Sequence, residues 1–592
     1  RKSGGAKPGE IVVAHLTEQP GSETQPVGEI VEVLGAADAP NIETEVAIRA
    51  HGIPFEWNEE ALAEAEGLGG RVRPKDKRDR EDLRELPLVT IDGADAKDFD
   101  DAVYAERAGS GWRLIVAIAD VSHYVQVETA LDSSARERGT SVYFPRRVVP
   151  MLPESLSNGL CSLNPRVDRL CMACEMHVNR QGKVTVSRFF PAVIRSHARL
   201  IYDEVAAALE NADSAEARRL EALMPRLECL HGVYRALARA RRRRGAIEFE
   251  IPEVTFAFDR RGRIARVVPR TRNDAHRIIE ECMIAANVEA ARFLKRNRMP
   301  ALYRTHSGPE EEALEDLAAF LEAYEIRLPR RDRIDPSRYN QIVDRIKGRP
   351  DEALIEIVLL RSLTRAVYQA EPTGHFGLAL SEYTHFTSPI RRYPDLMVHR
   401  AIRHVLEGGG PGDFGYPRGD MERLGVHCSN AERRADDATR EALDWLKCEF
   451  MQDKIGDEFD AVVTGVVDFG LFVQIPDLQI EGLVHVSSLG SEYFSRDTVH
   501  RRLTGERSGR SWQLADTVKV RVIRADLEQK KIDFELADAG PRGEDGGRRD
   551  RPRRRRARPR SRARRGWPSP GGSPERARSP SSAPRRGAGC RR

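Results

Sequence analysis

The stretch that most constrains this chain is TIDGADAKDFDDAV, residues 90–103, which holds five aspartates between Asp92 and Asp101. Carboxylates gathered this closely cannot all ionise unless cations neutralise them. Ligand sets made only of oxygen, without His or Cys, favour hard ions such as magnesium or manganese. A calcium-binding EF-hand is disfavoured, because no start position combines its alternating acidic ligands with Gly at six and Glu at twelve. From these residues alone, the remaining alternative is a solvated acidic turn with one Asp capping a helix.

The order of residues around the cluster suggests what the cations would do. Asp92 ends an expected strand, Gly93 turns the chain, and the other acids follow after a short loop. Two divalent ions about 3.5–4 Å apart serve in-line displacement at phosphorus, and dense aspartate clusters suit that arrangement. The sequence therefore favours metal-dependent phosphoryl chemistry at this turn.

The 592 residues suggest a multidomain α+β protein, since a domain usually takes about 100–200 residues. We expect a partial β-barrel over 1–52 and a charged connector with helical propensity over 53–84. A large α+β region follows over 85–450 and a five-stranded barrel of the OB-fold type over 456–538. Residues 539–592 have almost no apolar side chains and are expected to be disordered.

Several local patterns carry this division. The segments 10–16, 27–35 and 43–52 each alternate apolar and polar side chains or carry β-branched residues, which predicts three strands. The segment 275–297 predicts a helix with one apolar face. The residues expected on that face are Ile279, Cys282, Met283, Ala286 and Phe293.

The eight cysteines are scattered through a long chain, which argues against a secreted disulfide framework and for a reducing cytoplasm. Cys171 and Cys174 form a CxxC pair, but RLCMACEMHV is typical of a strand, and no second pair stands at zinc-site spacing. No apolar run approaches the roughly 20 residues that cross a bilayer. The first residues carry neither an initiator Met nor an apolar signal, so we expect a fragment or a processed product.

Charge is distributed very unevenly along the chain. Residues 540–592 hold 19 arginines against four acids, a net charge of +15, which leaves −11 on the other 539 residues of a chain whose total is +4. An acidic body with a polybasic tail predicts a polyanionic partner held partly by the tail. A tail that only solubilises the chain is the alternative.

Six motifs, in this order, resemble the catalytic RNB domain of the RNase II and RNase R family. They are TIDGADAKDFDDAVYAE, LIVAIADVSHYV, SVYFPRRVVPMLPESLSNGLCSL, RRGAIEF, IIEECMIAAN and HFTSPIRRYPDLMVHR. The resemblance covers about residues 25–538. It implies a processive 3′-to-5′ exoribonuclease that releases nucleoside 5′-monophosphates and depends on magnesium, with manganese as the alternative and two ions during catalysis. It also makes the first barrel the end of a cold-shock domain, and the last one an RNA-binding OB domain of the S-one type.

The family motif assigns roles to four of the five aspartates. By resemblance, Asp92, Asp98 and Asp101 contact metal, and Asp100 aligns the attacking water; Asp95 has no counterpart and is expected to be a loop charge. The motif also makes Arg391 the residue that grips the scissile phosphate. A guanidinium can bind phosphate bidentately, and Ser388 with Pro389, or Pro394, could begin a helix whose N–H groups attract anions. Arg392 is expected to be a supporting or surface charge.

Aromatic residues can stack on bases without selecting which base. By resemblance, Tyr143 and Phe249 clamp the terminal nucleotides, while Tyr202 and Glu281 form the pocket for the last nucleotide and its ribose. In the second barrel, the RNA-facing positions fall on Phe469, Phe472 and His485. Ordinary packing in a core is the alternative for each of these aromatic residues.

The expected partner is RNA whose single-stranded 3′ end threads into a channel, with ribosome-associated RNA as one possible source. No membrane partner is expected, and a cytoplasmic monomer fits best. The basic tail and DGADAKDFDDAV favour an RNase R-like enzyme that degrades structured RNA. An RNase II-like enzyme that stalls at duplexes is one alternative, and a non-catalytic RNA-binding protein on the same fold is the other.

Overall fold

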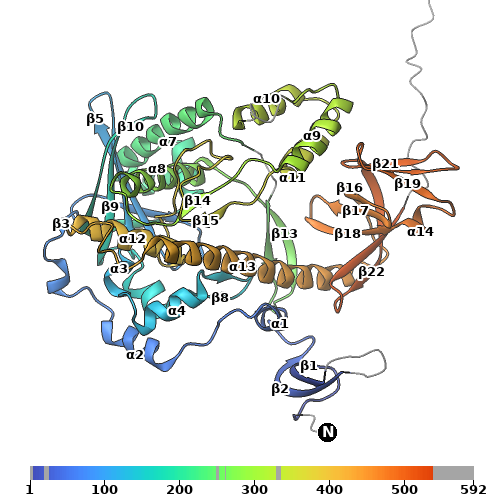
Figure 1. Cartoon of the computed structure of the whole chain (residues 1–592), viewed down its shortest axis with the longest axis horizontal. Coiled ribbons are helices and arrows are strands. Elements are labelled where there is room, and N and C mark those ends of the chain that lie inside the picture. Colours follow the sequence, from blue (N-terminus) through green and yellow to red (C-terminus); the bar gives the residue numbers. More distant parts are fainter. Residues whose placement is uncertain (1–3, 19–25, 249–252, 261, 329–334, 538–592) are drawn as a thin grey trace, which may run out of the picture. The chain divides into compact units, whose positions relative to one another are not determined.

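A computed structural model of the chain describes residues 4–18, 26–248, 253–260, 262–328 and 335–537 (Figure 1). Phe249 and the Arg-rich tail over 539–592, both singled out from the sequence, lie outside the described residues. The predicted multidomain α+β organisation is confirmed, with a mixed sheet among helices in the central region and a closed barrel after it.

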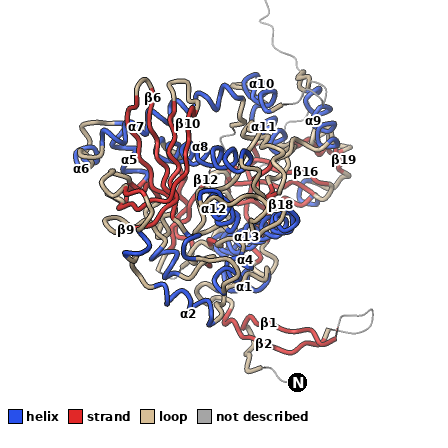
Figure 2. Tube along the Cα trace, turned by 60° about the vertical axis from the view of Figure 1, so that its left-hand side comes forward, coloured by secondary structure: helices blue, strands red, loops and turns tan. Residues whose placement is uncertain are grey.

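The central region is built on a seven-stranded sheet in the order β11-β4-β5-β6-β9-β10-β3. Its strands are β3 (Glu81–Asp82), β4 (Val89–Asp92), β5 (Asp101–Ala108), β6 (Gly111–Ala119), β9 (Asp168–Val178), β10 (Val184–Arg195) and β11 (Ala198–Ile201). The outer pairs β11–β4 and β10–β3 are parallel and the inner neighbours are antiparallel. The strands stand together as one sheet in Figure 2.

Both faces of this sheet are buried. Along β6, Leu114 and Val116 join one apolar core, whereas the alternating Ile115 and Ala117 join another. A strand buried on both faces needs apolar side chains at every position, which explains the unbroken run LIVAIA. Burial on both sides holds β4, β5 and β6 rigidly, and the aspartate turn connects two of them.

Different helices cover the two faces. The first core includes α5 (Tyr202–Glu210), α7 (Met224–Arg244) and α8 (Asp274–Arg296). The second includes α2 (Glu59–Leu68), α4 (Ala130–Arg138) and the start of α13 (Arg418–Gln452), while α12 (Tyr393–Leu406) contributes to both.

The helix predicted over 275–297 is confirmed as α8. Ile279, Cys282 and Ala286 are buried in the first core, and Met283 and Phe293 pack against it. The CxxC pair is also where the sequence placed it, because Cys171 and Cys174 lie buried in β9. Among the described residues the seven cysteines are free thiols.

The N-terminal part differs from expectation at one element. Strands β1 (Glu10–Glu18) and β2 (Val27–Ala36) form the predicted antiparallel pair, but the strand predicted over 43–52 is wrong, since Ile42–Ala50 is the helix α1. Ala47 and Ile48 of this helix are buried in a cluster with Ala438 of α13. Burial of adjacent residues against another helix suits a helical face, and this tertiary contact outweighs the β-propensity of the segment.

The C-terminal region contains the predicted five-stranded barrel, closed in the order β16-β17-β18-β23-β22. These strands are β16 (Glu458–Val467), β17 (Gly470–Ile475), β18 (Ile480–His485), β22 (Thr517–Asp526) and β23 (Lys531–Leu536). A small sheet of β19 (Phe494–Asp497), β20 (Arg502–Gly505) and β21 (Ser511–Gln513) is inserted between β18 and β22.

The remaining elements are short or peripheral to the site. They are the 3₁₀ turn η1 (Pro74–Lys77), the π-helical turn η2 (Ser155–Leu160), α3 (Val121–Tyr124), α6 (Ala215–Arg219), α9 (Glu311–Ala323), α10 (Pro336–Ile346), α11 (Glu352–Arg361), α14 (Val486–Leu489), and the strand pairs β7 (Val142–Tyr143) with β8 (Val148–Val149), β12 (Glu253–Phe258) with β13 (Ile264–Arg270), and β14 (Tyr303–Thr305) with β15 (Val367–Gln369). None of the helices within the described ranges has the length and apolar content that crossing a bilayer requires.

Candidate functional site

Four of the five clustered aspartates are gathered by the turn between β4 and β5. Asp92 is the last residue of β4 and Asp101 the first of β5, and the two strands are antiparallel neighbours. The carbonyl of Asp100 accepts a hydrogen bond of 2.8 Å from the Ala119 N–H, which ties the turn to β6. Asp95, expected to be a loop charge, is exposed at the tip of the turn.

Three of these carboxylates each have one buried oxygen without a hydrogen-bond partner. Oδ2 of Asp92, of Asp100 and of Asp101 is buried and has no hydrogen-bond partner. Burial raises the pKa of Asp92 to about 6, with the nearby charge of Asp98 adding to the effect. Burial likewise raises the pKa of Asp100 and of Asp101 well above the ordinary value. Unpartnered buried carboxylate oxygens are costly, and a bound hard cation would satisfy them.

The chemistry of these residues fits a divalent metal ion, although their spacing is not that of a metal-ligand set. Within the described ranges, no three His, Cys, Asp or Glu side chains already stand in the arrangement of a metal-ligand set. The donor set is all oxygen, which is the chemistry that magnesium and manganese prefer.

Arg391 lies directly against the cluster. Its Nε is 3.6 Å from Oδ2 of Asp100, an ion-pair distance rather than a hydrogen bond. Its Nη2 donates to Oγ of Ser388 over 3.0 Å, and the N–H of Ile390 donates to Oδ1 of Asp100 over 2.8 Å. The Asp100 side chain is 5% exposed and that of Arg391 is 42% exposed, so the guanidinium is the accessible partner of a buried carboxylate.

Arg391 sits on a turn, and the helix begins after it. Helix α12 starts at Tyr393 with Arg392 as its N-cap and Pro394 in its first turn, so the start at Ser388 is wrong and the start at Pro394 is the one observed. The carbonyl of Ser388 accepts hydrogen bonds from the N–H groups of Arg391 and Arg392 instead. This turn projects Arg391 away from α12 and towards Asp100.

Two predicted base-stacking tyrosines also border the cluster. Tyr143 is 42% exposed, and its hydroxyl donates to Oδ2 of Asp98 over 2.6 Å. Ile201 pairs with Asp92 across β11 and β4, which places Tyr202 at the same edge. One side of Tyr202 is covered by a stacked His276, with ring centroids 4.0 Å apart. Each tyrosine therefore stands beside the aspartates.

Glu281 is less directly connected to the site. It lies on α8, is 5% exposed, and accepts a hydrogen bond of 3.0 Å from Nη1 of Arg241. Burial raises the pKa of Glu281 even though Arg241 opposes the shift. Among the described residues it has no hydrogen bond or ion pair with the four aspartates. Arg241 was in the sequence only one of four consecutive arginines, so its contact with Glu281 was not predicted.

A groove leads away from Arg391 and Tyr143. The cavity is about 580 Å³ and is open along one side of α13, with Arg440 and Lys447 among its lining residues. The lining is mixed in charge, because Glu432, Asp436 and Asp444 stand among its cationic side chains. The groove joins α13 to Arg391 and Tyr143, the two lining residues that contact the aspartates.

The three barrel residues predicted to face RNA are close to one another. Phe469 is 50% exposed and lies edge-to-face with Phe472, with centroids 6.1 Å apart. His485 pairs with Gly470 across β17 and β18 and is exposed. Phe472 also lines a cavity of about 440 Å³ with Arg361 and Arg496. These positions form part of a surface rather than the barrel core.

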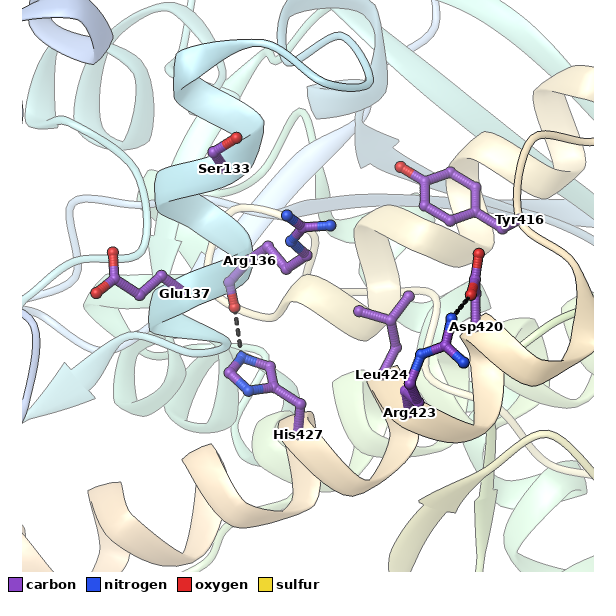
Figure 3. Close-up of a pocket in the computed structure, with 8 residues that line it drawn as sticks. All are labelled: Ser133, Arg136, Glu137, Tyr416, Asp420, Arg423, Leu424 and His427. Carbon is purple, nitrogen blue, oxygen red and sulfur yellow. Dashed lines mark hydrogen bonds and ion pairs between the residues drawn. The ribbon is translucent and has the colours of Figure 1, made fainter.

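Another cavity, of about 520 Å³, lies between α4 and α13 (Figure 3). Arg136, Tyr416 and Arg423 are among its lining residues, and Arg423 is paired with Asp420. None of the residues predicted from the sequence as functional lines it. Its position therefore does not add to the site described above.

Comparisons with known proteins match three domain families to different parts of the chain. The RNB domain matches residues 80–408, the cold shock domain residues 1–58, and the S1 RNA binding domain residues 452–537. Ribonuclease R of Vibrio parahaemolyticus is 50% identical over 544 residues, covering 90% of this chain and 65% of the relative. Ribonuclease R of Escherichia coli K12 is 49% identical over 541 residues, covering 90% of this chain and 66% of the relative. The chain thus spans just under two thirds of the length of these curated relatives.

Solved structures show the same similarity. RNase R of Mycoplasma genitalium, in complex with ribose-methylated single-stranded RNA, superposes with a TM-score of 0.84 at 27% identity, covering 89% of this chain and 83% of that one. Yeast Ssd1, a pseudonuclease, superposes with a TM-score of 0.64 at 19% identity, covering 84% of this chain and 62% of that one. At that identity the second likeness shows the fold alone, so the fold by itself does not decide whether a chain cuts RNA.

Proposed function

The chain belongs to the RNB domain family, and on that premise we propose that it is a hydrolytic exoribonuclease that shortens RNA from its 3′ end. It would release nucleoside 5′-monophosphates processively. The observation that carries the proposal is the buried cluster of Asp92, Asp100 and Asp101, whose unpartnered oxygens lie beside the accessible guanidinium of Arg391. The ribonuclease R relatives at about half identity support the same activity.

We propose a role for each residue at the cleavage point. Arg391 holds the scissile phosphate and stabilises charge that develops on it, since a fixed guanidinium in a partly dry site stabilises an anion strongly. Asp100 orients the attacking water. The Ile390 N–H holds Asp100 in place through their hydrogen bond.

Further residues would hold the strand. Tyr143, together with Phe249, clamps the terminal nucleotides by stacking, and Tyr202, whose ring stacks on His276, helps to receive the last base. Glu281 would bind the ribose, where a contact to the 2′-hydroxyl distinguishes RNA from DNA. Phe469, Phe472 and His485 would bind the strand on the barrel before it enters the groove along α13.

Exoribonucleases of this family depend on a metal, and we propose magnesium, with two ions during catalysis. Asp92, Asp98 and Asp101 would hold it, and when bound it supplies charge stabilisation at the reacting phosphate oxygens. The structures of the Mycoplasma enzyme in complex with ribose-methylated single-stranded RNA and with double-stranded RNA support RNA as the substrate.

Magnesium should stabilise the folded protein through these carboxylates. We expect magnesium to raise the melting temperature of EDTA-treated protein by about 2 °C or more, because a ligand that binds only the folded state stabilises it. Without metal, Asp101→Asn should melt at a higher temperature than the unchanged protein, because a buried charge is removed. Magnesium should raise the melting temperature of this variant much less. Asp95→Asn is the matched control, and an equal magnesium gain in all three proteins would exclude this site.

The activity is tested with a 5′-labelled single-stranded RNA, with magnesium or with EDTA, reading product lengths over time. Shortening from the 3′ end one nucleotide at a time, abolished by EDTA, is the expected result. A DNA strand of the same sequence should persist. Internal cuts, or equal cutting of DNA, would contradict the proposal.

Two alternatives to an RNase R-like enzyme can be separated by experiment: an enzyme that stops at duplexes, and a protein that binds RNA without cutting it. On a duplex with a single-stranded 3′ overhang, an RNase R-like enzyme should proceed into the duplex, whereas an RNase II-like enzyme should stop a few nucleotides before it. A non-catalytic RNA-binding protein should bind both substrates and shorten neither. The intact aspartates and Arg391 favour catalysis.

The setting of the activity is also a proposal. We place the protein in the cytoplasm as a monomer, and the free thiols of the described cysteines fit a reducing compartment. Ribosome-associated RNA is one candidate substrate, and the tail over 539–592 would add phosphate contacts. The domain limits proposed are 1–52, 85–450 and 456–538.

A further inference from the structure

We propose that Asp395 is a positioning residue that fixes Arg391 and the Ile390 amide against Asp100 by holding the turn that carries both. The inference rests on the proposed function, because it assigns Asp395 a part in that reaction. Among the described residues, this carboxylate makes its hydrogen bonds and ion pair with the turn 388–392 and not with the four aspartates.

Asp395 is completely buried in the first turn of α12. Its Oδ1 accepts hydrogen bonds of 2.8 Å from the Ser388 N–H and of 2.8 Å from Nη2 of Arg392. Its Oδ2 is buried without a hydrogen-bond partner. One oxygen therefore joins the two ends of the turn 388–392, and the side chain has no contact with solvent.

The two ends of this turn control what lies between them. Oγ of Ser388 accepts the hydrogen bond from Nη2 of Arg391, so fixing the Ser388 backbone fixes the direction of that guanidinium. The Ile390 N–H, inside the same turn, donates to Oδ1 of Asp100. Asp395 thus acts on both reacting groups through the backbone of one short segment.

Arg392 completes the arrangement from inside the protein. Its side chain is 18% exposed and pairs with Asp395, three residues along α12. Burial by itself would lower the pKa of Arg392. The negative charge of Asp395 is the largest effect in the other direction, and the pKa of Arg392 lies above its ordinary value. Arg392 therefore remains a fixed cation behind the turn, which leaves Arg391 as the one of the two arginines directed at the cluster.

The geometry separates two substitutions. Asp395→Ala removes both hydrogen bonds to the turn, whereas Asp395→Asn keeps an oxygen that can accept both and places its amide where Oδ2 has no partner. Loss of an indirect support of this kind typically costs about 10–100-fold in activity. With magnesium present, we expect Asp395→Ala to lower kcat for a single-stranded RNA by that factor and to change KM less than threefold, as an order of magnitude. At a temperature where the variant is folded, Asp395→Asn should recover most of kcat, while its melting temperature falls because Arg392 loses its neutralising charge.

A matched control is available on helix α4. Asp132 is also buried and pairs with α12, through Arg400 over 2.7 Å and the Tyr393 hydroxyl over 2.9 Å, but it does not contact the turn 388–392. Asp132→Ala should lower the melting temperature while kcat at a permissive temperature stays close to that of the unchanged protein. In an Arg391→Ala background, Asp395→Ala should cost less than it does alone, because part of its effect passes through Arg391.

Three results would overturn the inference: full kcat in Asp395→Ala, an equal loss in Asp395→Asn, or an equal loss of kcat in Asp132→Ala. Hydrogen exchange over residues 388–392 tests the same idea without any reaction, since Asp395→Ala should speed exchange there. Unchanged exchange would also refute it. Failure of the unchanged protein to shorten RNA would instead reject the proposed function, while the exchange measurement still decides whether Asp395 holds the turn.

Discussion

Asp100→Asn should reduce nucleotide release by about 10³-fold while RNA binding stays within about threefold. The substitution keeps the size of the side chain and an oxygen for the Ile390 N–H, and removes only the charge. Asp100 is buried next to Arg391, so the charge it contributes acts in a poorly solvated place where electrostatic effects are large. Turnover of a short labelled RNA, with binding measured separately without metal, separates the two effects.

The control for Asp100 lies in the same turn. Asp95 belongs to the same run of acids but is exposed, and Asp95→Asn should leave both turnover and binding unchanged. Asp100→Asn should also raise the melting temperature without metal, because a buried carboxylate with a raised pKa destabilises the folded state at neutral pH. Unchanged turnover in Asp100→Asn would remove this residue from the site, and a lower melting temperature would point to misfolding instead.

The sequence predicted the parts of the site whose residues are neighbours along the chain. Asp92 and Asp101 are close because one turn joins β4 to β5, and the acidic run along that turn favoured a cation site from the sequence alone. The buried face of α8 followed from its periodicity in the same way. Local patterns suffice where a single element or turn brings the groups together.

The sequence failed where a contact between distant elements decides the outcome. Residues 43–52 carry β-branched side chains in a pattern that fits a strand, yet α1 forms because Ala47 and Ile48 pack on α13, almost 400 residues later. The contact between Arg241 and Glu281 spans 40 residues and depends on how α7 lies beside α8. No local signal distinguishes Arg241 from the three arginines that follow it.

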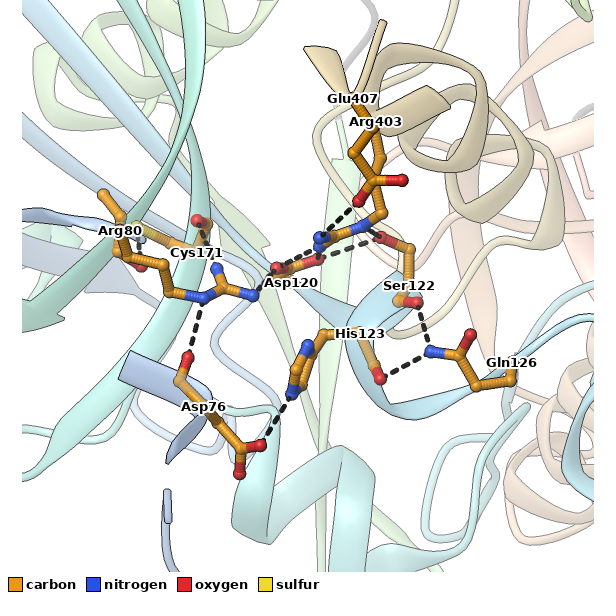
Figure 4. Close-up of polar contacts among 10 residues, drawn as sticks. Asp76, Arg80, Asp120, Ser122, His123, Gln126, Cys171, Arg403 and Glu407 are labelled. Atoms are coloured by element: carbon orange, nitrogen blue, oxygen red, sulfur yellow. Dashed lines mark hydrogen bonds and ion pairs between the residues drawn. The ribbon is translucent and has the colours of Figure 1, made fainter. Parts of the chain in front are cut away.

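Asp120→Asn should lower the free energy of unfolding at pH 7 by about 3–5 kcal/mol, the usual cost of breaking a buried ion pair from one side. Asp120 is completely buried after β6, between Arg80 and Arg403 (Figure 4). Nη2 of Arg80 lies 2.7 Å from its Oδ2, Arg403 donates to both oxygens, and Oγ of Ser122 donates over 2.9 Å. An asparagine cannot neutralise two guanidiniums, so both would be left charged in a largely dry place.

The same carboxylate predicts how stability depends on pH. Burial alone would raise the pKa of Asp120, but the charges of Arg403 and Arg80 outweigh it and hold the pKa well below its ordinary value. A carboxyl whose pKa is lowered by folding stabilises the protein above its unfolded pKa of about 3.9 and loses that contribution as the pH falls towards the folded value. Burial also lowers the pKa of nearby His123. Below about pH 6.5 the unfolded chain therefore binds a proton at His123 more readily than the folded protein does, which lowers stability further.

Urea unfolding of the two proteins between pH 7 and pH 3 measures this contribution. The unchanged protein should begin to lose this contribution as the pH falls below about 4, and the curve of Asp120→Asn should lie lower at pH 7 and be flatter below about pH 4. Adding Arg80→Met should recover part of the loss, because the cost comes from stranded charge rather than from lost volume. Asp437→Asn, at an exposed ion pair on α13, is the control and should leave the curve unchanged. Parallel curves for Asp120→Asn and the unchanged protein would mean that this carboxylate does not link the connector to α12 as the structure indicates.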